Sequence, residues 1–237
     1  MISPRTAVNV GRRRASRWVR QLHRTPKPAF SDLDQKLSQY LTKRDGFFIE
    51  AGANDGYSQS NTYRLETELG WSGLLVEGIP DLAARCTKLR VRSTVVNCGL
   101  VDPDYLEQTV RMRFADLMSL VEGAQGDTEA ENQHVQDGLW VQGLTKSYEV
   151  DVVARTLESL LDELDQTATI DFMSLDVEGY ELNVLRGMNL AKYRPRYLLV
   201  EARFYDEVDI YLREHQYVQL DQLSHHDFLY GDSLIAS

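Results

Sequence analysis

The 237-residue sequence predicts one α/β domain built on a doubly wound, mostly parallel sheet. Two observations predict this fold. Short apolar runs that end in turn residues alternate along the chain with segments of helical periodicity, which is the pattern of βαβ units. The runs are apolar almost without interruption, as strands are when helices cover both faces of their sheet. A chain of this length buries a full core without disulfides, so Cys86 and Cys98 are expected as reduced thiols of a cytoplasmic protein.

A basic N-terminal extension, residues 1–30, precedes the domain predicted over residues 31–237. The extension contains eight Lys/Arg and no acid, whereas the remaining 207 residues hold 18 Lys/Arg against 36 Asp/Glu. A body this acidic is a poor partner for nucleic acid. The arm lacks the apolar core of a secretory signal. Three roles stay open for it: a solvated arm, an organelle transit peptide, or contact with an anionic surface such as a membrane. No apolar run of the chain reaches the roughly 18 residues of a transmembrane span.

The first element after the arm is a helix over 33–41, where Leu33, Leu37, Tyr40 and Leu41 recur at helical spacing. Apolar runs then predict strands at 47–49, 74–76, 94–96, 172–175 and 197–200. Segments between or after these runs predict helices at 61–69, 82–89, 157–164, 181–190 and 208–215.

Residues 101–150 break this rhythm. Residues 105–114 alternate like an exposed strand or hairpin, which could pair with a second copy of the chain in a homo-oligomer. The polar segment 123–138 is expected as a long loop, and a loop of this length is usually a lid or a binding loop. Near the C-terminus, runs at 217–220 and 228–230 predict an antiparallel pair that closes the sheet.

The first chemical signal is the turn after the first strand, with the sequence Glu50-Ala51-Gly52-Ala53-Asn54-Asp55-Gly56. Ligands of doubly wound sheets bind outside the carboxyl ends of the strands, and glycine lets the backbone approach them. The spacing differs from the GxGxxG of dinucleotide sites. The two acids of the turn would repel a pyrophosphate but not a ligand with an ammonium and a sulfonium, which favours S-adenosylmethionine over NAD.

The second signal is Glu77, which ends the second strand. An acid at this position accepts hydrogen bonds from ribose hydroxyls. NAD enzymes use the same device, so Glu77 does not separate the two cofactors. The alternative is a surface acid at a strand end.

The third signal is the run from Asp171 to Glu181, in which an apolar strand ends in Asp176-Val177-Glu178-Gly179. Carboxylates at this edge can orient or deprotonate a hydroxyl, or hold a divalent cation. The alternative for Glu178 is a favourable placement at a helix N-terminus. The run does not match the aromatic Asp/Asn-Pro-Pro motif of nucleic-acid amine methyltransferases, which counts against methylation of a base.

Taken together, the segments 49–56, 76–78, 97–100, 156–160 and 170–187 resemble the FkbM family of S-adenosylmethionine-dependent methyltransferases. The most specific piece is Asp176-Val177-Glu178-Gly179-Tyr180-Glu181 with Leu185-Arg186-Gly187. The resemblance covers residues 45–205. It implies a seven-stranded, Rossmann-like class I methyltransferase sheet and O-methylation of a hydroxyl. Known acceptors of the family include sugars and polyketide-type natural products. The cofactor residues implied by the resemblance are Glu50, Gly52, Ala53, Asn54, Asp55, Gly56, Glu77, Asn97, Cys98 and Gly99.

Asp176 is the first candidate for the catalytic base, with Glu178 beside it facing the acceptor. Among the histidines, His225 in the C-terminal turn is the strongest competitor. Asp176, Glu178 and Glu201 would be the ligands if the enzyme uses Mg²⁺, the alternative being that Glu201 binds a loop amide or a basic side chain. The insertion at 101–150 is expected to take part in recognising the acceptor. Met118 and Ser119 in it are candidates for contact with the cofactor or the acceptor.

Three functions stay open. The first is an O-methyltransferase that acts on a saccharide or glycoconjugate, and the polar composition of the insertion favours it weakly. The second is a methyltransferase for a non-sugar small molecule, such as a polyketide, a lipid or a carboxylate. The third is a non-catalytic cofactor-binding module that docks through its basic arm. The intact Glu50–Gly56, Glu77 and Asp176–Gly179 segments count against the third.

Overall fold

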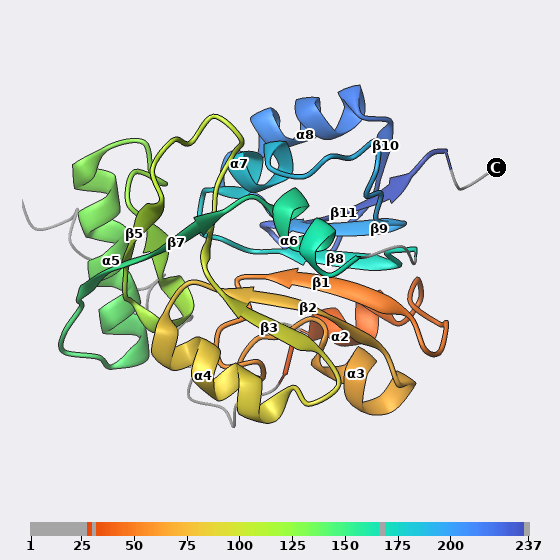
Figure 1. The fold of residues 1–237 in the computed structure, drawn as a ribbon, viewed down its shortest axis with the longest axis horizontal. Helices are drawn as coiled ribbons and strands as arrows, with labels where there is room; N and C mark the ends of the chain where they lie inside the picture. The colour runs from red at the N-terminus through yellow and green to blue at the C-terminus, as the bar shows by residue number, and fades with distance from the viewer. Residues whose placement is uncertain (1–27, 30–31, 166–168, 235–237) are drawn as a thin grey trace, which may run out of the picture.

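The computed structural model describes residues 28–29, 32–165 and 169–234. Its centre is a seven-stranded sheet with the strand order β10-β11-β9-β8-β1-β2-β3 (Figure 1). The strands are β1 (Phe47–Ala51), β2 (Ser72–Glu77), β3 (Thr94–Asn97), β8 (Phe172–Leu175), β9 (Tyr197–Glu201), β10 (Tyr217–Gln222) and β11 (Asp227–Asp232). Nearly all of the basic extension, residues 1–27 and 30, lies outside the described residues. None of the helices within the described ranges combines the length and the apolar character that a membrane crossing requires.

The seven-stranded sheet is mixed. β3, β2, β1, β8 and β9 pair in parallel, whereas β11 runs antiparallel to both β9 and β10. The parallel strands β1, β2, β8 and β9 are buried on both faces, whereas the edge strand β3 is partly exposed. Phe48 and Ile49 of β1 point to opposite sides and are both fully buried. Because parallel strands leave the sheet at the same edge, the residues after β1, β2 and β8 meet there. The antiparallel pair expected near the C-terminus is present as β10 and β11.

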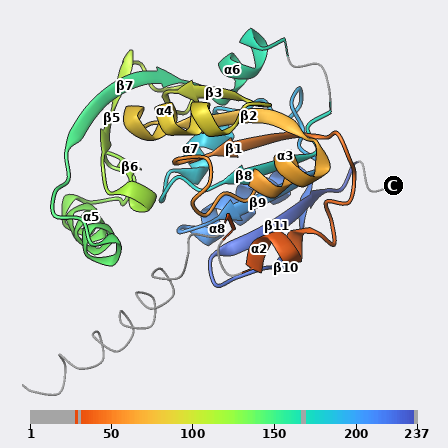
Figure 2. The ribbon, with the colours of Figure 1, turned by 90° about the horizontal axis from the view of Figure 1, so that it is seen from below.

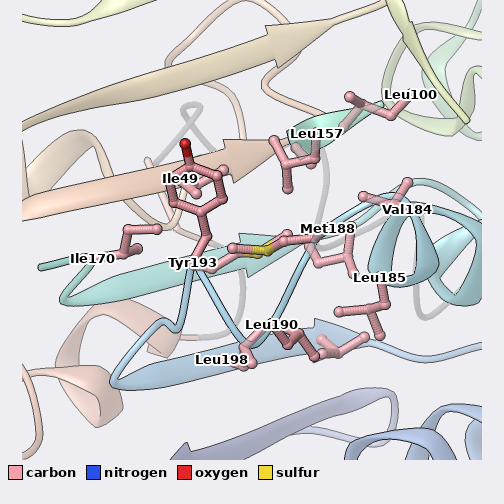
Figure 3. Packing of buried hydrophobic residues seen from close by; sticks show 14 of the residues in the cluster. Ile49, Leu100, Leu157, Ile170, Val184, Leu185, Met188, Leu190, Tyr193 and Leu198 are labelled. Atoms are coloured by element: carbon pink, nitrogen blue, oxygen red, sulfur yellow. The ribbon is translucent and has the colours of Figure 1, made fainter. Parts of the chain in front are cut away.

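Two helical layers cover the sheet. α6 (Leu157–Glu163), α7 (Glu181–Arg186) and α8 (Tyr205–Glu214) pack with one face, and Figure 3 shows Leu157, Val184 and Leu185 among the side chains of this buried cluster. α2 (Leu33–Leu37) and α3 (Tyr63–Leu69) pack on the other face. α4 (Pro80–Leu89) divides its contacts, since Cys86 packs with α2 and α3 while Leu82 packs against the insertion.

The insertion and the residues that flank it build a second, four-stranded sheet in the order β4-β7-β5-β6. Its strands are β4 (Gly99–Leu100), β5 (Thr109–Arg113), β6 (Leu120–Val121) and β7 (Glu149–Arg155). A 3₁₀ turn, η2 (Asp116–Met118), lies between β5 and β6, and α5 (Thr128–Gln142) lies between β6 and β7. Figures 1 and 2 show α5, β5 and β7 together at one end of the central sheet. The exposed strand expected at 105–114 is therefore β5, but it pairs on both sides, with β6 and β7.

The prediction of a long loop at 123–138 is wrong, because α5 occupies most of this segment. Asp127 caps the helix by accepting a hydrogen bond of 2.8 Å from the amide of Ala130. The buried residues follow one helical face: Glu131, His134, Val135, Gly138 and Leu139. Two of these, Glu131 and His134, are polar and a third is glycine, so an apolar periodicity is missing from the sequence. Gly138 is required for packing, since a Cβ there would lie 3.0 Å from the Cβ of Met118.

Two predicted helices are shorter than expected. The helix predicted at 33–41 ends at Leu37, and the one predicted at 181–190 ends at Arg186. Gly187 follows α7 and packs on the insertion, where an added Cβ would lie 2.3 Å from the carbonyl oxygen of Val101. Gly187 thus lets the end of α7 lie against the backbone of another segment.

Candidate functional site

A pocket opens at the carboxyl edge of the parallel strands, between the central sheet and the insertion. Its empty volume is about 770 Å³, which includes the part open to solvent. Polar and apolar side chains share its wall. The lining residues are Gly52, Asn54, Ser58, Gln59, Ser60, Val76, Glu77, Gly78, Cys98, Gly99, Leu100, Met112, Asp116, Leu117, Ser119, Leu120, Val121, Asp176, Val177, Glu178, Tyr180 and Val184.

Gly52 lets two strand ends touch. Its φ is +85°, and an added Cβ would lie 1.8 Å from the carbonyl oxygen of Asp176. The amide of Asp176 in turn donates a 3.1 Å hydrogen bond to the carbonyl of Ala51. Only glycine meets both requirements, the backbone conformation and the close approach. The turns after β1 and β8 therefore form one continuous wall of the pocket.

Glu77 lies at the end of β2 with its carboxylate held by backbone amides. One oxygen accepts a 2.8 Å hydrogen bond from the amide of Asn54, and the other accepts a 2.7 Å hydrogen bond from the amide of Ile79. Glu77 is buried, and burial raises the pKa of its carboxyl to about 7. Asp116 of the insertion raises this pKa further and receives a 3.4 Å hydrogen bond from the Asn54 amide group. Glu77 thus presents fixed carboxylate oxygens at the pocket wall.

The two acids of the β1 turn lie outside the pocket lining and support the turn instead. Glu50 is buried and accepts hydrogen bonds from the hydroxyls of Ser60 and Thr62 and from the guanidinium of Arg90. Asp55 accepts hydrogen bonds from the amides of the two residues at positions 57 and 58. The sequence shows that these two side chains are charged. Whether they meet a ligand or other groups of the protein depends on how the chain after β1 folds around them.

The strand-three end divides in the same way. Cys98 and Gly99 line the pocket. Asn97 is exposed, and its side-chain amide donates 2.8 Å hydrogen bonds to the carbonyls of Glu77 and Gly78. Asn97 therefore holds the end of β2 in place and is not itself among the pocket-lining residues. Of the remaining predicted cofactor residues, Asn54 lines the pocket, whereas Ala53 and Gly56 lie behind it.

The Asp176–Gly179 turn brings two carboxyl groups to the pocket. Glu178 and Gly179 both have positive φ, +57° and +100°. The carboxylate of Glu181 accepts hydrogen bonds from the amides of Val177 and Gly179, and the Gln125 side chain donates one to the carbonyl of Glu178. A non-glycine residue in this backbone region is strained, and such strain clusters at functional sites. Contacts from two segments hold Glu178 in this conformation.

The acids at this edge affect one another. Burial, followed by the carboxylates of Glu201 and Glu178, raises the pKa of Asp176 well above its usual range. Burial, followed by Asp227, raises the pKa of Glu201 to about 7, while a hydrogen bond with Asp176 acts in the opposite direction. Asp176 and Glu201 thus form a pair of carboxyl groups that shares a proton. Burial, followed by Glu201 and Glu181, also raises the pKa of Glu178 well above its usual range.

The structure brings His134, not His225, to the Asp176–Gly179 turn. The Nε2 of His134 lies 3.4 Å from a carboxylate oxygen of Glu178. His225 is exposed in the turn between β10 and β11, and its described contacts are with Gln222 and His226. His134 lies in the segment that the sequence predicts as a polar loop. It reaches the turn because it belongs to the buried face of α5, and the sequence does not predict that helix.

The predicted magnesium site does not form. Asp176 pairs with Glu201, whereas a carboxylate oxygen of Glu178 lies 3.4 Å from the Nε2 of His134. In the described ranges, no group of three or more His, Cys, Asp or Glu side chains is placed to hold a metal ion. Of the two insertion residues singled out in the sequence, Ser119 lines the pocket, and the carbonyl of Met118 is 3.1 Å from the Nε2 of His134.

The sequence model of the methyltransferase FkbM domain matches residues 50–219. No curated protein matches the chain. Among solved structures, a methyltransferase FkbM from Methylobacillus flagellatus has 13% identity and a TM-score of 0.48, over 95% of this chain and 60% of its own. The chain thus spans 60% of the length of that protein.

Two further solved structures are similar at lower TM-scores. A human methyltransferase 10 domain containing protein has 14% identity and a TM-score of 0.41, over 95% of this chain and 82% of its own. A SAM-dependent methyltransferase from Geobacter sulfurreducens, in complex with S-adenosyl-L-homocysteine, has 10% identity and a TM-score of 0.40, over 88% and 72%. The family model covers most of the chain, including the β1 turn, Glu77 and the Asp176–Gly179 turn, and on that ground the chain belongs to the FkbM methyltransferase family.

Proposed function

We propose that this methyltransferase uses S-adenosylmethionine to methylate a hydroxyl of a saccharide or glycoconjugate. One observation carries the proposal: the Gly52 turn, the buried Glu77 and the carboxyl groups of Asp176 and Glu178 line the same pocket. A hydroxyl is a weak nucleophile, and a positioned base accelerates its reaction by about 10²–10⁴-fold.

The pocket fits the methyl donor by the chemistry of its groups. Each carboxylate oxygen of Glu77 accepts one amide and retains a lone pair for a ribose hydroxyl. Leu100, Met112 and Leu120 offer apolar surface to an adenine ring. When bound, S-adenosylmethionine supplies an electrophilic methyl group on a cationic sulfonium.

The acceptor side is assigned to the turn after β8. Glu178 lines the pocket, and its raised pKa brings its basicity closer to that of an efficient base at neutral pH. In its ionised form Glu178 takes the proton of the acceptor hydroxyl and passes it to solvent. Asp176 shares a proton with Glu201, which leaves it less able to accept one from the acceptor hydroxyl. We therefore propose Glu178 as the base in place of Asp176, the first candidate from the sequence.

Calorimetric titration tests the donor first. We expect S-adenosylhomocysteine to bind with micromolar affinity and NAD not to bind. Transfer of a labelled methyl group from S-adenosylmethionine to a panel of free and nucleotide-linked sugars then tests the acceptor. Binding of S-adenosylhomocysteine with no transfer to any sugar, but transfer to a polyketide or lipid alcohol, would replace the saccharide by a non-sugar acceptor. Folded protein that binds no S-adenosylhomocysteine would overturn the donor assignment.

A further inference from the structure

Helix α5 of the insertion contributes one buried imidazole to the turn after β8, that of His134. The ring is 4% exposed. Its Nε2 is 3.1 Å from the carbonyl oxygen of Met118 and 3.4 Å from a carboxylate oxygen of Glu178, while its Nδ1 is 3.5 Å from the guanidinium of Arg203. The ring therefore connects α5 with three other segments: η2, the Asp176–Gly179 turn and the loop after β9.

The contacts of the ring determine where its proton lies. A guanidinium has only donors, so the Nδ1 of His134 acts as the acceptor toward Arg203. In the neutral ring the hydrogen is then on Nε2, where the Met118 carbonyl accepts it. Burial and the charge of Arg203 lower the pKa of His134, which keeps the ring neutral. The Nε2–H also faces Glu178, whose carboxylate, when ionised, can only accept hydrogen bonds.

The backbone of Glu178 is held from the same side. Gln125, which precedes α5, donates a 2.5 Å hydrogen bond to the carbonyl of Glu178. The position of Gly179 leaves no room for a side chain, since an added Cβ would lie 2.7 Å from the carbonyl of Ala124. The insertion thus contacts both the main chain and the carboxylate of this turn.

We propose that His134 is a positioning residue that aims the Glu178 carboxylate into the pocket, with Arg203 fixing the tautomer of its ring. The inference rests on the proposed function for its kinetic consequence, because Glu178 is there the base. The present separation of 3.4 Å is long for a hydrogen bond, and catalytic hydrogen bonds often tighten only when the substrate is bound. The role of the insertion is then to complete the active site.

Three variants and a matched control separate positioning from folding. His134→Ala removes the Nε2 donor, and His134→Gln places a side-chain amide donor near the same point. Arg203→Met removes the partner of Nδ1. His215→Gln is the control, because His215 closes the C-terminus of α8 through the Tyr211 carbonyl, and it is not among the pocket-lining residues. Melting temperature and S-adenosylhomocysteine affinity are measured for each protein.

Methyl transfer to the best acceptor of the sugar panel gives the kinetic result. We expect His134→Ala to lower kcat by about 10²-fold, with the affinity for S-adenosylhomocysteine unchanged within about threefold. His134→Gln should recover at least about tenfold of that loss, and His215→Gln should match the wild type. Equal kcat values for the wild type and a folded His134→Ala protein would overturn the proposal, as would a folded His134→Gln protein no better than His134→Ala.

Nitrogen-15 NMR of the imidazoles supplies a reading that needs no acceptor. We expect the Nε2–H tautomer for His134 in the wild type, a mixture of tautomers in Arg203→Met, and a shifted Nε2 resonance in Glu178→Gln. An Nδ1–H tautomer, or a resonance indifferent to Glu178→Gln, contradicts the inference. If the wild type methylates no acceptor, the proposed function fails, and the NMR result still decides whether His134 and Glu178 interact.

Discussion

Identical side-chain types in this chain do different work because their surroundings differ. Glu50, Glu77 and Glu178 each lie at or just beyond the end of a strand in the central sheet. Glu50 is enclosed by hydroxyls and Arg90, Glu77 is held by two amides at the pocket wall, and Glu178 lies beside a buried imidazole. Each carboxylate therefore has its own partners. Predictions at this scale concern single groups.

Glu77→Gln tests the proposed ribose contact. The variant keeps the size of the side chain but replaces one oxygen acceptor by a donor, which then faces the main-chain amide of Asn54 or of Ile79. Hydrogen bonds to charged groups contribute about 1.5–3 kcal/mol, so we expect the affinity for S-adenosylhomocysteine to fall at least about tenfold. Calorimetry measures the change. Glu68→Gln is the control, since Glu68 is exposed on α3 and pairs with Arg64. Unchanged affinity in Glu77→Gln would remove Glu77 from the binding site.

Glu178 sets the expected pH dependence of transfer. A general base must be ionised, and the pKa of Glu178 is raised well above its ordinary value. The rate should therefore rise with pH through a limb that lies well above the pH 4.5 typical of a free glutamate. Glu178→Gln should abolish this limb and lower kcat by about 10²–10⁴-fold. Asp176→Asn should retain more activity, because an amide can still donate to Glu201. A pH–rate profile in which Asp176→Asn is the poorer enzyme would return the base to Asp176.

At the scale of elements, the site is assembled where three strand ends and one insertion meet. Gly52 lets the β1 turn touch the β8 turn, and Gly138 lets α5 lie close to η2. Neither contact is a property of one element alone. The conformation of each turn therefore depends on the backbone of its neighbour.

Gly52→Ala measures this dependence. The new Cβ would lie 1.8 Å from the Asp176 carbonyl at a φ of +85°. Gly126→Ala is a matched control, with a φ of +84° and nothing within 4 Å of the added Cβ. A left-handed conformation costs about 1–2 kcal/mol for a side-chain-bearing residue, equivalent to a few degrees of melting temperature, about 2–4 °C per kcal/mol. We expect Gly52→Ala to lose clearly more than Gly126→Ala and also to weaken S-adenosylhomocysteine binding. Equal melting temperatures would show that the two turns are not in contact.

At the scale of the whole molecule, the chain places several acids where they resist ionisation. Burial raises the pKa of Glu77, Glu181 and Glu201 to about 7. The folded state then binds more protons than the unfolded state between about pH 4.5 and 7, so the free energy of unfolding falls as pH rises through this window. His134 acts in the opposite direction, because its pKa is lowered in the folded state. The acids outnumber it.

Thermal unfolding of the ligand-free protein checks this balance. We expect the melting temperature to fall between pH 5 and pH 8. For Glu77 alone, the change from an ordinary pKa of 4.5 to about 7 corresponds to about 3 kcal/mol at full ionisation. Glu77→Gln should therefore show a flatter pH dependence than the wild type, while the exposed Glu68→Gln control should not. A melting temperature that rises steadily from pH 5 to pH 8 would contradict the raised pKa values.

What the sequence determined by itself follows from local periodicity and from the order of turn residues. The strands β1, β2, β3, β8 and β9 were predicted within two residues at each end, because a buried parallel strand is recognisable from its own apolar run. The same holds for the pocket residues Gly52, Glu77, Asp176 and Glu178, since every residue that follows a parallel strand emerges at the same edge.

Tertiary structure alone decided the rest. Helix α5 was missed because its buried face contains Glu131, His134 and Gly138, whose burial depends on partners distant in sequence. For the same reason the sequence does not show that Glu77 lines the pocket while Glu50 and Asp55 do not. Nor does it show that His134, and not His225, lies beside Glu178. Some hydrogen-bond partners and close backbone contacts join segments more than a hundred residues apart, as Gly52 and Asp176 do. The sequence shows where a charged residue stands, but it does not show which of these segments its side chain contacts. The sequence therefore determined which edge of the sheet carries the chemistry, and three-dimensional packing decided which groups at that edge face the pocket.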